Sequence, residues 1–259
     1  MTVGIDSRHG ALKGPFIRWA DSAEARPGIV VQALQIAEGW VYMLEPAQGY
    51  VVREQVHASE QVVQVVEGSL RLQVGADERL LTPDDIAVVP IGAYHRGLVT
   101  TPSRIFELNT PADPKNLFDP ALGEQALQYP RAGATLRTAN GHVLGPFARW
   151  PRVAGGAAKN LFADRVLVQH LTVVAGTEVA GTTDGTVVVQ PLRGSIRLRF
   201  GDAEQVIDSG WVAIAAAGTP WAASCPDGAE LLEVRFRPQG PGAALSGLLA
   251  GVRKQLGRA

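Results

Sequence analysis

The sequence predicts an all-β protein built from two similar halves. Two observations carry this prediction: short runs rich in valine, isoleucine and leucine are separated by glycine, proline and aspartate, and a long stretch of the chain repeats itself. Short apolar runs with such punctuation are typical of antiparallel sandwiches and barrels. The chain has 259 residues, of which 46% are hydrophobic, so it can bury a core in one domain or in two.

The repeat is clearest between two segments that align without a gap. The segment "GSLRLQVGADERLLTPDDIAVVPIGAYH" begins at Gly68, and "GSIRLRFGDAEQVIDSGWVAIAAAGTPW" begins at Gly194, 126 residues later. A second pair of similar segments is "GPFIRW" from Gly14 and "GPFARW" from Gly145, 131 residues later. Self-similarity of this length indicates a duplicated domain.

The duplication predicts two domains, the first over residues 1–130 and the second over residues 131–259. Between them, the proline-rich residues 111–142 are typical of a short connection. We expect the two halves to pack around a pseudo-twofold axis, with Phe16 and Phe147 in equivalent places. After Pro241 an apolar stripe with helical spacing predicts a C-terminal amphipathic helix. The stripe consists of Leu245, Leu248, Leu249, Val252 and Leu256.

The composition argues against several classes of partner. The net charge of −1 provides no basic surface for nucleic acid or for an anionic membrane. No apolar run reaches the length of a membrane span, and the first residues lack the apolar core of a signal peptide. The single cysteine, Cys225, excludes an internal disulfide and suits a reducing compartment. We therefore expect a cytoplasmic protein with no nucleic-acid or membrane partner.

Two spaced motifs resemble those of the cupin family. The first family motif reads G, five residues, H-x-H, three or four residues, E, six residues, G. In this chain the corresponding positions hold Gly49, Gln55, His57, Gln61 and Gly68, and every spacing fits.

The second family motif reads G, five residues, P-x-G-x-x-H. Here Pro90, Gly92 and His95 fall in place, with Asp84 at the position of the leading glycine. Through the internal repeat, the resemblance extends over most of the chain. It implies a bicupin, with two tandem double-stranded β-helix barrels.

The resemblance also implies a metal site, whose ligands would be Gln55, His57, Gln61 and His95. The ion would be divalent: zinc, iron, manganese or nickel. Glutamine at position 61 is similar to a glutamine-type branch of the family, H-x-H…Q…H, whereas Gln55 replaces the first histidine. Because a carboxamide oxygen binds these ions less well than imidazole and carries no charge, we expect a weakened site. Glu60 could add charge only if a β-bulge turned it inward.

The second half offers an internal comparison. Its corresponding positions hold Gly181, Thr183, Val187 and Trp221, none of which suits a metal ion. We expect Val187 and Trp221 to fill that barrel. The alternative for the first half is that its two histidines are ordinary polar residues in a barrel without a metal.

Two further residues are candidates for catalysis. Side chains alternate along a strand, so if Gln55 and His57 point inward, Arg53 does too. A guanidinium there would bind a carboxylate or another oxyanion through two oxygens. The alternative is a solvated arginine, or one paired with Glu54. Tyr94 is a candidate proton donor or pocket residue.

Three functions are compatible with these residues. The first is a metalloenzyme that acts on a small polar or aromatic carbonyl or carboxylate substrate by Lewis-acid catalysis, as an isomerase, lyase or cyclase. The second is a metal-dependent dioxygenase. The third is a non-catalytic bicupin that binds a small molecule. Exposed strand edges need to be covered, and a homodimer is one way to cover them.

Overall fold

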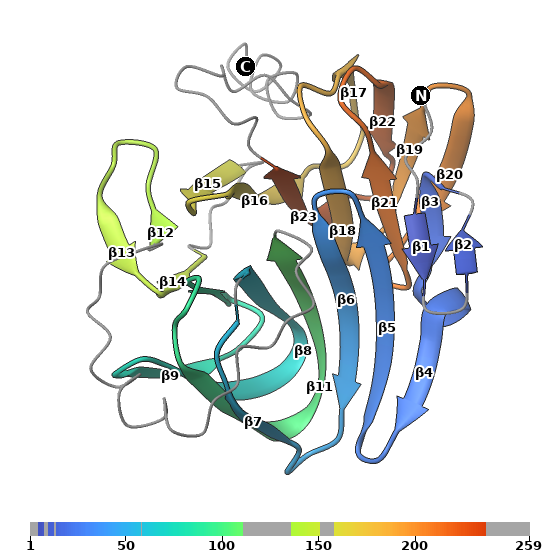
Figure 1. Ribbon diagram of the computed structural model, residues 1–259. Coiled ribbons are helices and arrows are strands. Elements are labelled where there is room, and N and C mark those ends of the chain that lie inside the picture. Colours follow the sequence, from blue (N-terminus) through green and yellow to red (C-terminus); the bar gives the residue numbers. More distant parts are fainter. Residues whose placement is uncertain are drawn as a thin grey trace.

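The computed structural model describes residues 5–7, 10–12, 14–57, 59–110, 136–150 and 158–236 (Figure 1). Their secondary structure consists of strands apart from one 3-10 turn, η1 (Trp19–Ser22), which confirms the all-β prediction. No helix within these ranges is long and apolar enough to cross a membrane. Most of the predicted connection and the whole C-terminal helix lie outside the described residues.

The strands of the first half are β1 (Ile5–Ser7), β2 (Gly10–Leu12), β3 (Phe16–Arg18), β4 (Ala23–Arg26), β5 (Ile29–Ile36), β6 (Gly39–Pro46), β7 (Val51–Gln55), β8 (Glu60–Val74), β9 (Asp77–Leu81), β10 (Asp85–Val89) and β11 (His95–Thr110). Those of the second half are β12 (Leu136–Arg137), β13 (Val143–Gly145), β14 (Phe147–Arg149), β15 (Ala158–Phe162), β16 (Val166–Val173), β17 (Thr177–Thr182), β18 (Val187–Gly194), β19 (Ile196–Phe200), β20 (Ala203–Ile207), β21 (Trp211–Ala215), β22 (Pro220–Cys225) and β23 (Ala229–Phe236).

These strands form three antiparallel sheets. The first runs β14-β10-β8-β11-β6-β5-β1-β2, with β4, β7 and β9 attached to β5, β11 and β8. The second runs β13-β12-β15-β16-β23-β18-β21-β3, and the third runs β17-β22-β19-β20. In this arrangement β3 and β14 each lie in a sheet made otherwise of strands from the other half.

The exchanged strands have the same register in both halves. Phe147 of β14 lies opposite Ala87 of β10, and Phe16 of β3 lies opposite Ala213 of β21. Each phenylalanine packs against the barrel core of the half that its strand joins. The prediction that the two GPF segments occupy equivalent places is therefore confirmed.

A buried hydrogen bond fixes each exchanged segment. The indole nitrogen of Trp19 donates to Oε1 of Gln190 over 2.8 Å, and that of Trp150 donates to Oε1 of Gln64 over 2.7 Å. The amide nitrogen of each glutamine donates in turn to two backbone carbonyls. In both glutamines the side-chain oxygen and nitrogen therefore have hydrogen-bond partners. Burying these amides does not leave a polar atom unpaired, so the contacts stabilise the fold.

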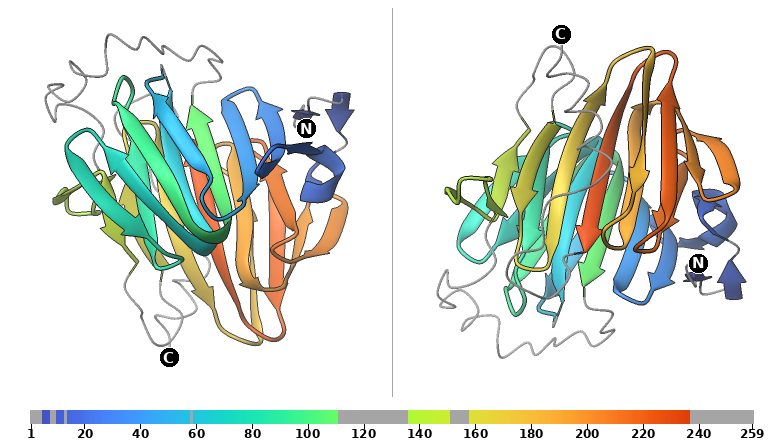
Figure 2. Two further views of the ribbon diagram at one scale, coloured as in Figure 1. Left: turned by 90° about the horizontal axis from the view of Figure 1, so that it is seen from below. Right: turned by 90° about the horizontal axis from the view of Figure 1, so that it is seen from above.

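The three largest groups of buried apolar side chains among the described residues form three layers. The layer between the halves includes Phe106 and Leu108 of β11 together with Val234 of β23. The other two layers fill the barrels, around Val63 in the first half and Leu198 in the second. Figure 2 shows the blue-to-green strands of the first half lying against the yellow-to-red strands of the second. Successive side chains of a strand point to opposite faces, so the β11 residues next to Phe106 and Leu108 face into the first barrel.

Candidate functional site

The inner face of the first barrel carries polar and aromatic side chains in register. Phe106 and Leu108 belong to the layer between the halves, so Glu107 and Asn109 point into the barrel. Asn109 lies opposite Gln61 of β8 and Trp40 of β6. Directly opposed residues share a face of the sheet, so these three side chains form one row across the barrel wall.

The two candidate histidines lie side by side at the end of this barrel. The ring centroids of His57 and His95 are 4.5 Å apart, with an angle of 71° between the planes. Both rings are buried, His57 at 6% exposure and His95 at 1%. The structure therefore brings together the two imidazoles that the separate motifs predicted.

Burial holds both imidazoles in the neutral form. It lowers the pKa of His57, against the effect of a hydrogen bond to the Ser59 carbonyl. It also lowers the pKa of His95 to about 3, with a further contribution from His57 and an opposing one from the Ala93 carbonyl. Neutral imidazole is the form that binds a metal ion.

The backbone also selects the tautomer of each ring. Nδ1 of His57 lies 3.4 Å from the Ser59 carbonyl oxygen, and Nδ1 of His95 lies 3.2 Å from that of Ala93. A protonated Nδ1 can donate to these carbonyl oxygens, which favours the tautomer with the lone pair on Nε2, although the Ser59 hydroxyl also lies 3.5 Å from Nδ1 of His57. Such bonds to Nδ1 are the usual support of a metal-binding histidine.

Nε2 of His95 is buried and has no hydrogen-bond partner. An orphaned acceptor of this kind costs free energy unless a ligand or ion occupies the adjacent space. It therefore fits a cation beside the two rings. Within the described ranges, however, no three His, Cys, Asp or Glu side chains gather closely enough to hold a metal ion, so the remaining ligands would have to be amides.

Gln61 is anchored to a carboxylate that the motif did not identify. Its amide nitrogen donates to Oε2 of Glu107 over 2.8 Å. Burial raises the pKa of Glu107 to about 7, against the opposing effect of the Gln61 hydrogen bond. The sequence did hold a signal for this residue: Glu107 and Glu233 lie 126 residues apart, so the repeat keeps a glutamate within two apolar strands.

Gln55 is half-buried and lies directly opposite His95, so it faces the same side of the sheet. The side chains of β7 do not alternate regularly between the two faces, because the strand register shifts between the pair His95–Gln55 and the pair Gly97–Val52. Arg53 is exposed. The expectation that Arg53 points into the barrel is wrong, and the irregular register is the reason.

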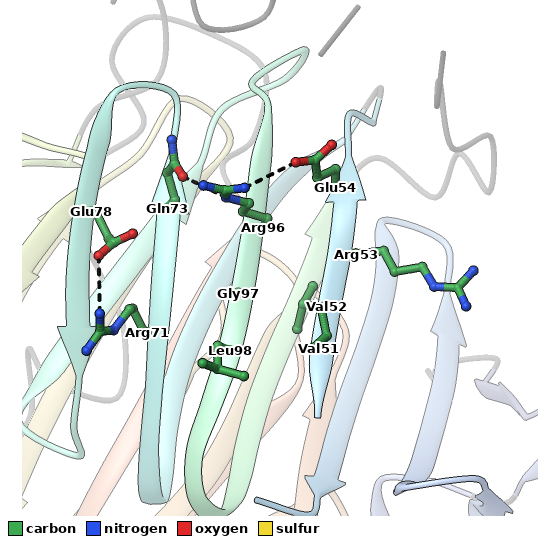
Figure 3. A pocket seen from close by; sticks show the side chains of 10 residues that line it. All are labelled: Val51, Val52, Arg53, Glu54, Arg71, Gln73, Glu78, Arg96, Gly97 and Leu98. Atoms are coloured by element: carbon green, nitrogen blue, oxygen red, sulfur yellow. Dashed lines mark hydrogen bonds and ion pairs between the residues drawn. The ribbon is translucent and has the colours of Figure 1, made fainter. Parts of the chain in front are cut away.

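Figure 3 shows Arg53 at a groove on the outer face of the first barrel, with its guanidinium directed away from the other side chains. The groove contains two exposed ion pairs, Arg71 with Glu78 and Arg96 with Glu54. A substrate-binding role for Arg53 stays a prediction, but in this position the side chain would act at the outer surface.

Tyr94 also contacts groups outside the histidine pair. Its ring is buried against Val56, and its hydroxyl bonds to the exposed carboxylate of Glu54. Burial raises the pKa of Tyr94, and the Glu54 contact raises it further. A catalytic role for Tyr94 stays a prediction.

Glu60, the proposed source of extra charge, is engaged elsewhere. It is fully buried, and its two carboxylate oxygens accept hydrogen bonds from the backbone nitrogens of Asp164 and Arg165. These donors belong to the turn between β15 and β16. Glu60 therefore joins the two halves and does not face the histidines.

The equivalent face of the second barrel is closed. Val187 and Trp221 both belong to its buried core, as predicted. Thr183 donates its hydroxyl proton to the Ala216 carbonyl. Gly181 lies opposite Trp221, as Gln55 lies opposite His95. The ligand positions of this barrel are thus filled by packing.

The first barrel is more accessible inside than the second. Trp40 and Tyr42 are stacked, with centroids 5.9 Å apart, and both are only partly buried. Glu107 and Asn109 are also only partly buried, whereas their counterparts in the second barrel, Glu233 and Arg235, are 0% and 5% exposed. Apolar and aromatic walls with a few polar groups are typical of small-molecule sites.

Comparison with known proteins agrees with this architecture. Residues 40–108 match the family model described as "Cupin domain". No curated protein matches the chain. Among solved structures, AerE from Microcystis aeruginosa superimposes with a TM-score of 0.63 at 12% identity, covering 83% of this chain and 95% of that one.

Two enzymes have a similar fold. Oxalate decarboxylase from Bacillus subtilis, described with Mn(II) centres, gives a TM-score of 0.65 at 12% identity, covering 90% of this chain and 79% of that one. Salicylate 1,2-dioxygenase from Pseudaminobacter salicylatoxidans gives 0.59 at 15% identity, covering 77% and 71%. At such identities the likeness establishes the fold alone, a two-barrel architecture, while the match to the cupin model is confined to residues 40–108.

Proposed function

We propose that the first barrel is a metal-dependent active site for a small polar or aromatic carbonyl or carboxylate substrate. The reaction class that suits it is non-redox: isomerisation, elimination or cyclisation. The observation that carries this proposal is the buried, unpartnered Nε2 of His95 beside the ring of His57. A pair of neutral imidazoles with supported Nδ1 atoms is arranged as metal ligands are, and the second barrel has no such pair among its described residues.

The residues that would hold the ion are His57, His95 and the amide oxygens of Gln55 and Gln61. When bound, a divalent ion would polarise a carbonyl or enolate oxygen of the substrate as a Lewis acid. The backbone carbonyl of Ser59 would orient the ring of His57, and that of Ala93 would orient the ring of His95.

The walls of the barrel would bind and orient the substrate. Trp40 and Tyr42 offer flat apolar faces, which suit a planar ring or conjugated system. Asn109, beside Trp40, offers an amide for a polar substituent. The enclosure around these groups would exclude water from a reactive enolate.

Metal titration of histidine variants tests this proposal. Metal-free protein without a polyhistidine tag is titrated calorimetrically with Zn²⁺, Fe²⁺, Mn²⁺ and Ni²⁺. We expect one equivalent in the wild type and none in His57→Ala or His95→Ala, with the fold retained. The exposed His142 provides a matched control, and His142→Ala should bind as the wild type does.

Two results would contradict the proposal. Absence of binding by the wild type at high micromolar metal would favour the non-catalytic bicupin. Retention of metal by His57→Ala and His95→Ala would place the ion elsewhere. Oxygen consumption by the loaded protein with hydroxylated aromatic acids would instead identify a dioxygenase.

A further inference from the structure

Glu107 and Glu233 are equivalent residues of the two barrels with different partners. Glu107 lies opposite Val63 on β8, and Glu233 lies opposite Val189 on β18, 126 residues further along in each case. Both face the interior of a barrel, where a lone carboxylate is costly because water solvates it poorly. Each barrel therefore has to accommodate a buried carboxyl group at the same position.

In the second barrel the compensation is built in. Nε of Arg235 donates to Oε1 of Glu233, and the same guanidinium also contacts Asp184 at 3.4 Å. Arg235 is two residues after Glu233, so its counterpart in the first barrel is Asn109, which is neutral. The barrel whose ligand positions are filled by packing thus carries a permanent cation next to its carboxylate.

In the first barrel Glu107 accepts a hydrogen bond from the neutral amide of Gln61. This bond also fixes the orientation of that amide. Because the nitrogen of Gln61 is engaged by Glu107, the oxygen is the end left to meet a cation. None of the four proposed ligands carries a charge, so a divalent ion there would need a nearby anion.

We propose that Glu107 is the charge-compensating and positioning residue of the ion site, acting through Gln61. This inference rests on the proposed function of the first barrel. Glu107 holds the Gln61 amide with its oxygen toward the cation and supplies the negative charge that the ligands lack. A bound ion would balance the negative charge of Glu107, as the guanidinium of Arg235 balances that of Glu233.

The test measures cobalt binding to metal-free protein by calorimetry and by visible absorption. Glu107→Gln keeps an acceptor for Gln61 but removes the charge, and it should weaken Co²⁺ binding roughly 10- to 100-fold, the usual effect of losing a support of a metal ligand. Asn109→Arg copies the second barrel and should weaken binding at least as much, because the guanidinium occupies Glu107. Glu204→Gln makes the same change of charge at an exposed carboxylate that pairs with Arg197 in the second half, and it serves as the control, with binding within about threefold of the wild type.

The outcomes separate this inference from the ion site itself. If the wild type binds Co²⁺ and both Glu107→Gln and Asn109→Arg bind it equally well, Glu107 has no part in the site, although the site stands. If the wild type binds no Co²⁺, the ion site and this inference both fail. Thermal unfolding of the metal-free variants shows whether a lost affinity reflects a lost fold, and we expect both to unfold at or above the wild-type temperature.

Discussion

The indole ring of Trp221 occupies the space into which a side chain at Gly181 would point. A Cβ built on Gly181 would lie 3.0 Å from two atoms of the ring, closer than ordinary van der Waals contact. Trp221 is 3% exposed and packed in the core of the second barrel. The tryptophan and the glycine are therefore coupled, and together they close the barrel at the place where the first barrel holds Gln55 and His95.

This coupling predicts a double-mutant effect. Gly181→Ala should destabilise the protein by about 1–3 kcal/mol, because the buried indole has little room to move. In a Trp221→Phe background the added methyl should cost much less, since the smaller ring leaves space. Denaturant unfolding of the four proteins measures the coupling. Equal costs of Gly181→Ala in the two backgrounds would contradict it.

The exchanged strands predict matched effects in the two halves. Trp19→Phe and Trp150→Phe each remove an indole donor and leave a buried glutamine oxygen unpaired. Each should therefore cost about 1–3 kcal/mol in unfolding free energy, beyond the effect of the smaller ring. Because each bond joins opposite halves, we expect a single unfolding transition in both variants. A variant that unfolds in two separate steps would show that the halves do not depend on this contact.

The acid side of the stability profile depends in part on His170. Burial lowers the pKa of this imidazole, which stacks on Trp150 at 5.4 Å, while the neighbouring Glu230 opposes the shift. The unfolded chain takes up a proton near pH 6.5 and the folded protein resists it, so stability falls as the pH drops through about 6.5. His170→Gln should flatten this fall between about pH 7.5 and 5.5. Denaturant unfolding at several pH values measures the slope, and an unchanged slope would contradict the assignment.

The sequence could predict the fold and the histidine pair because both rest on spacing. Strand texture and an ungapped repeat define two barrels, and two motifs at the correct distance place His57 beside His95. It could not predict the position of Arg53, because one irregular step in the pairing of β7 reverses the alternation. Nor could it predict that Glu60 would bind the turn at Asp164, since that contact forms only when the two halves pack.

Glu107 could be predicted from the sequence only in part. Its strand is apolar in pattern and the family motif ends before it, so motif matching could not find it. Alignment of the two halves does place Glu107 over Glu233. What such an alignment cannot supply is the partner of each carboxylate, because Gln61 and Arg235 reach them from different positions along the chain.

The pairing of β7 with β11 predicts that a histidine at position 55 would strengthen metal binding. This residue lies opposite His95 and faces the same side of the sheet, so Gln55→His would place a third imidazole beside the pair. Because imidazole binds zinc, iron and nickel better than a carboxamide does, affinity for these ions should rise, by roughly tenfold or more. Glu54→His is the matched control: the neighbouring side chain is exposed and paired with Arg96 on the outer face, so it should leave affinity unchanged. Calorimetric titration with Zn²⁺ and Ni²⁺ compares the two variants. An equal gain in both, or a gain in neither, would mean that position 55 does not face the ion.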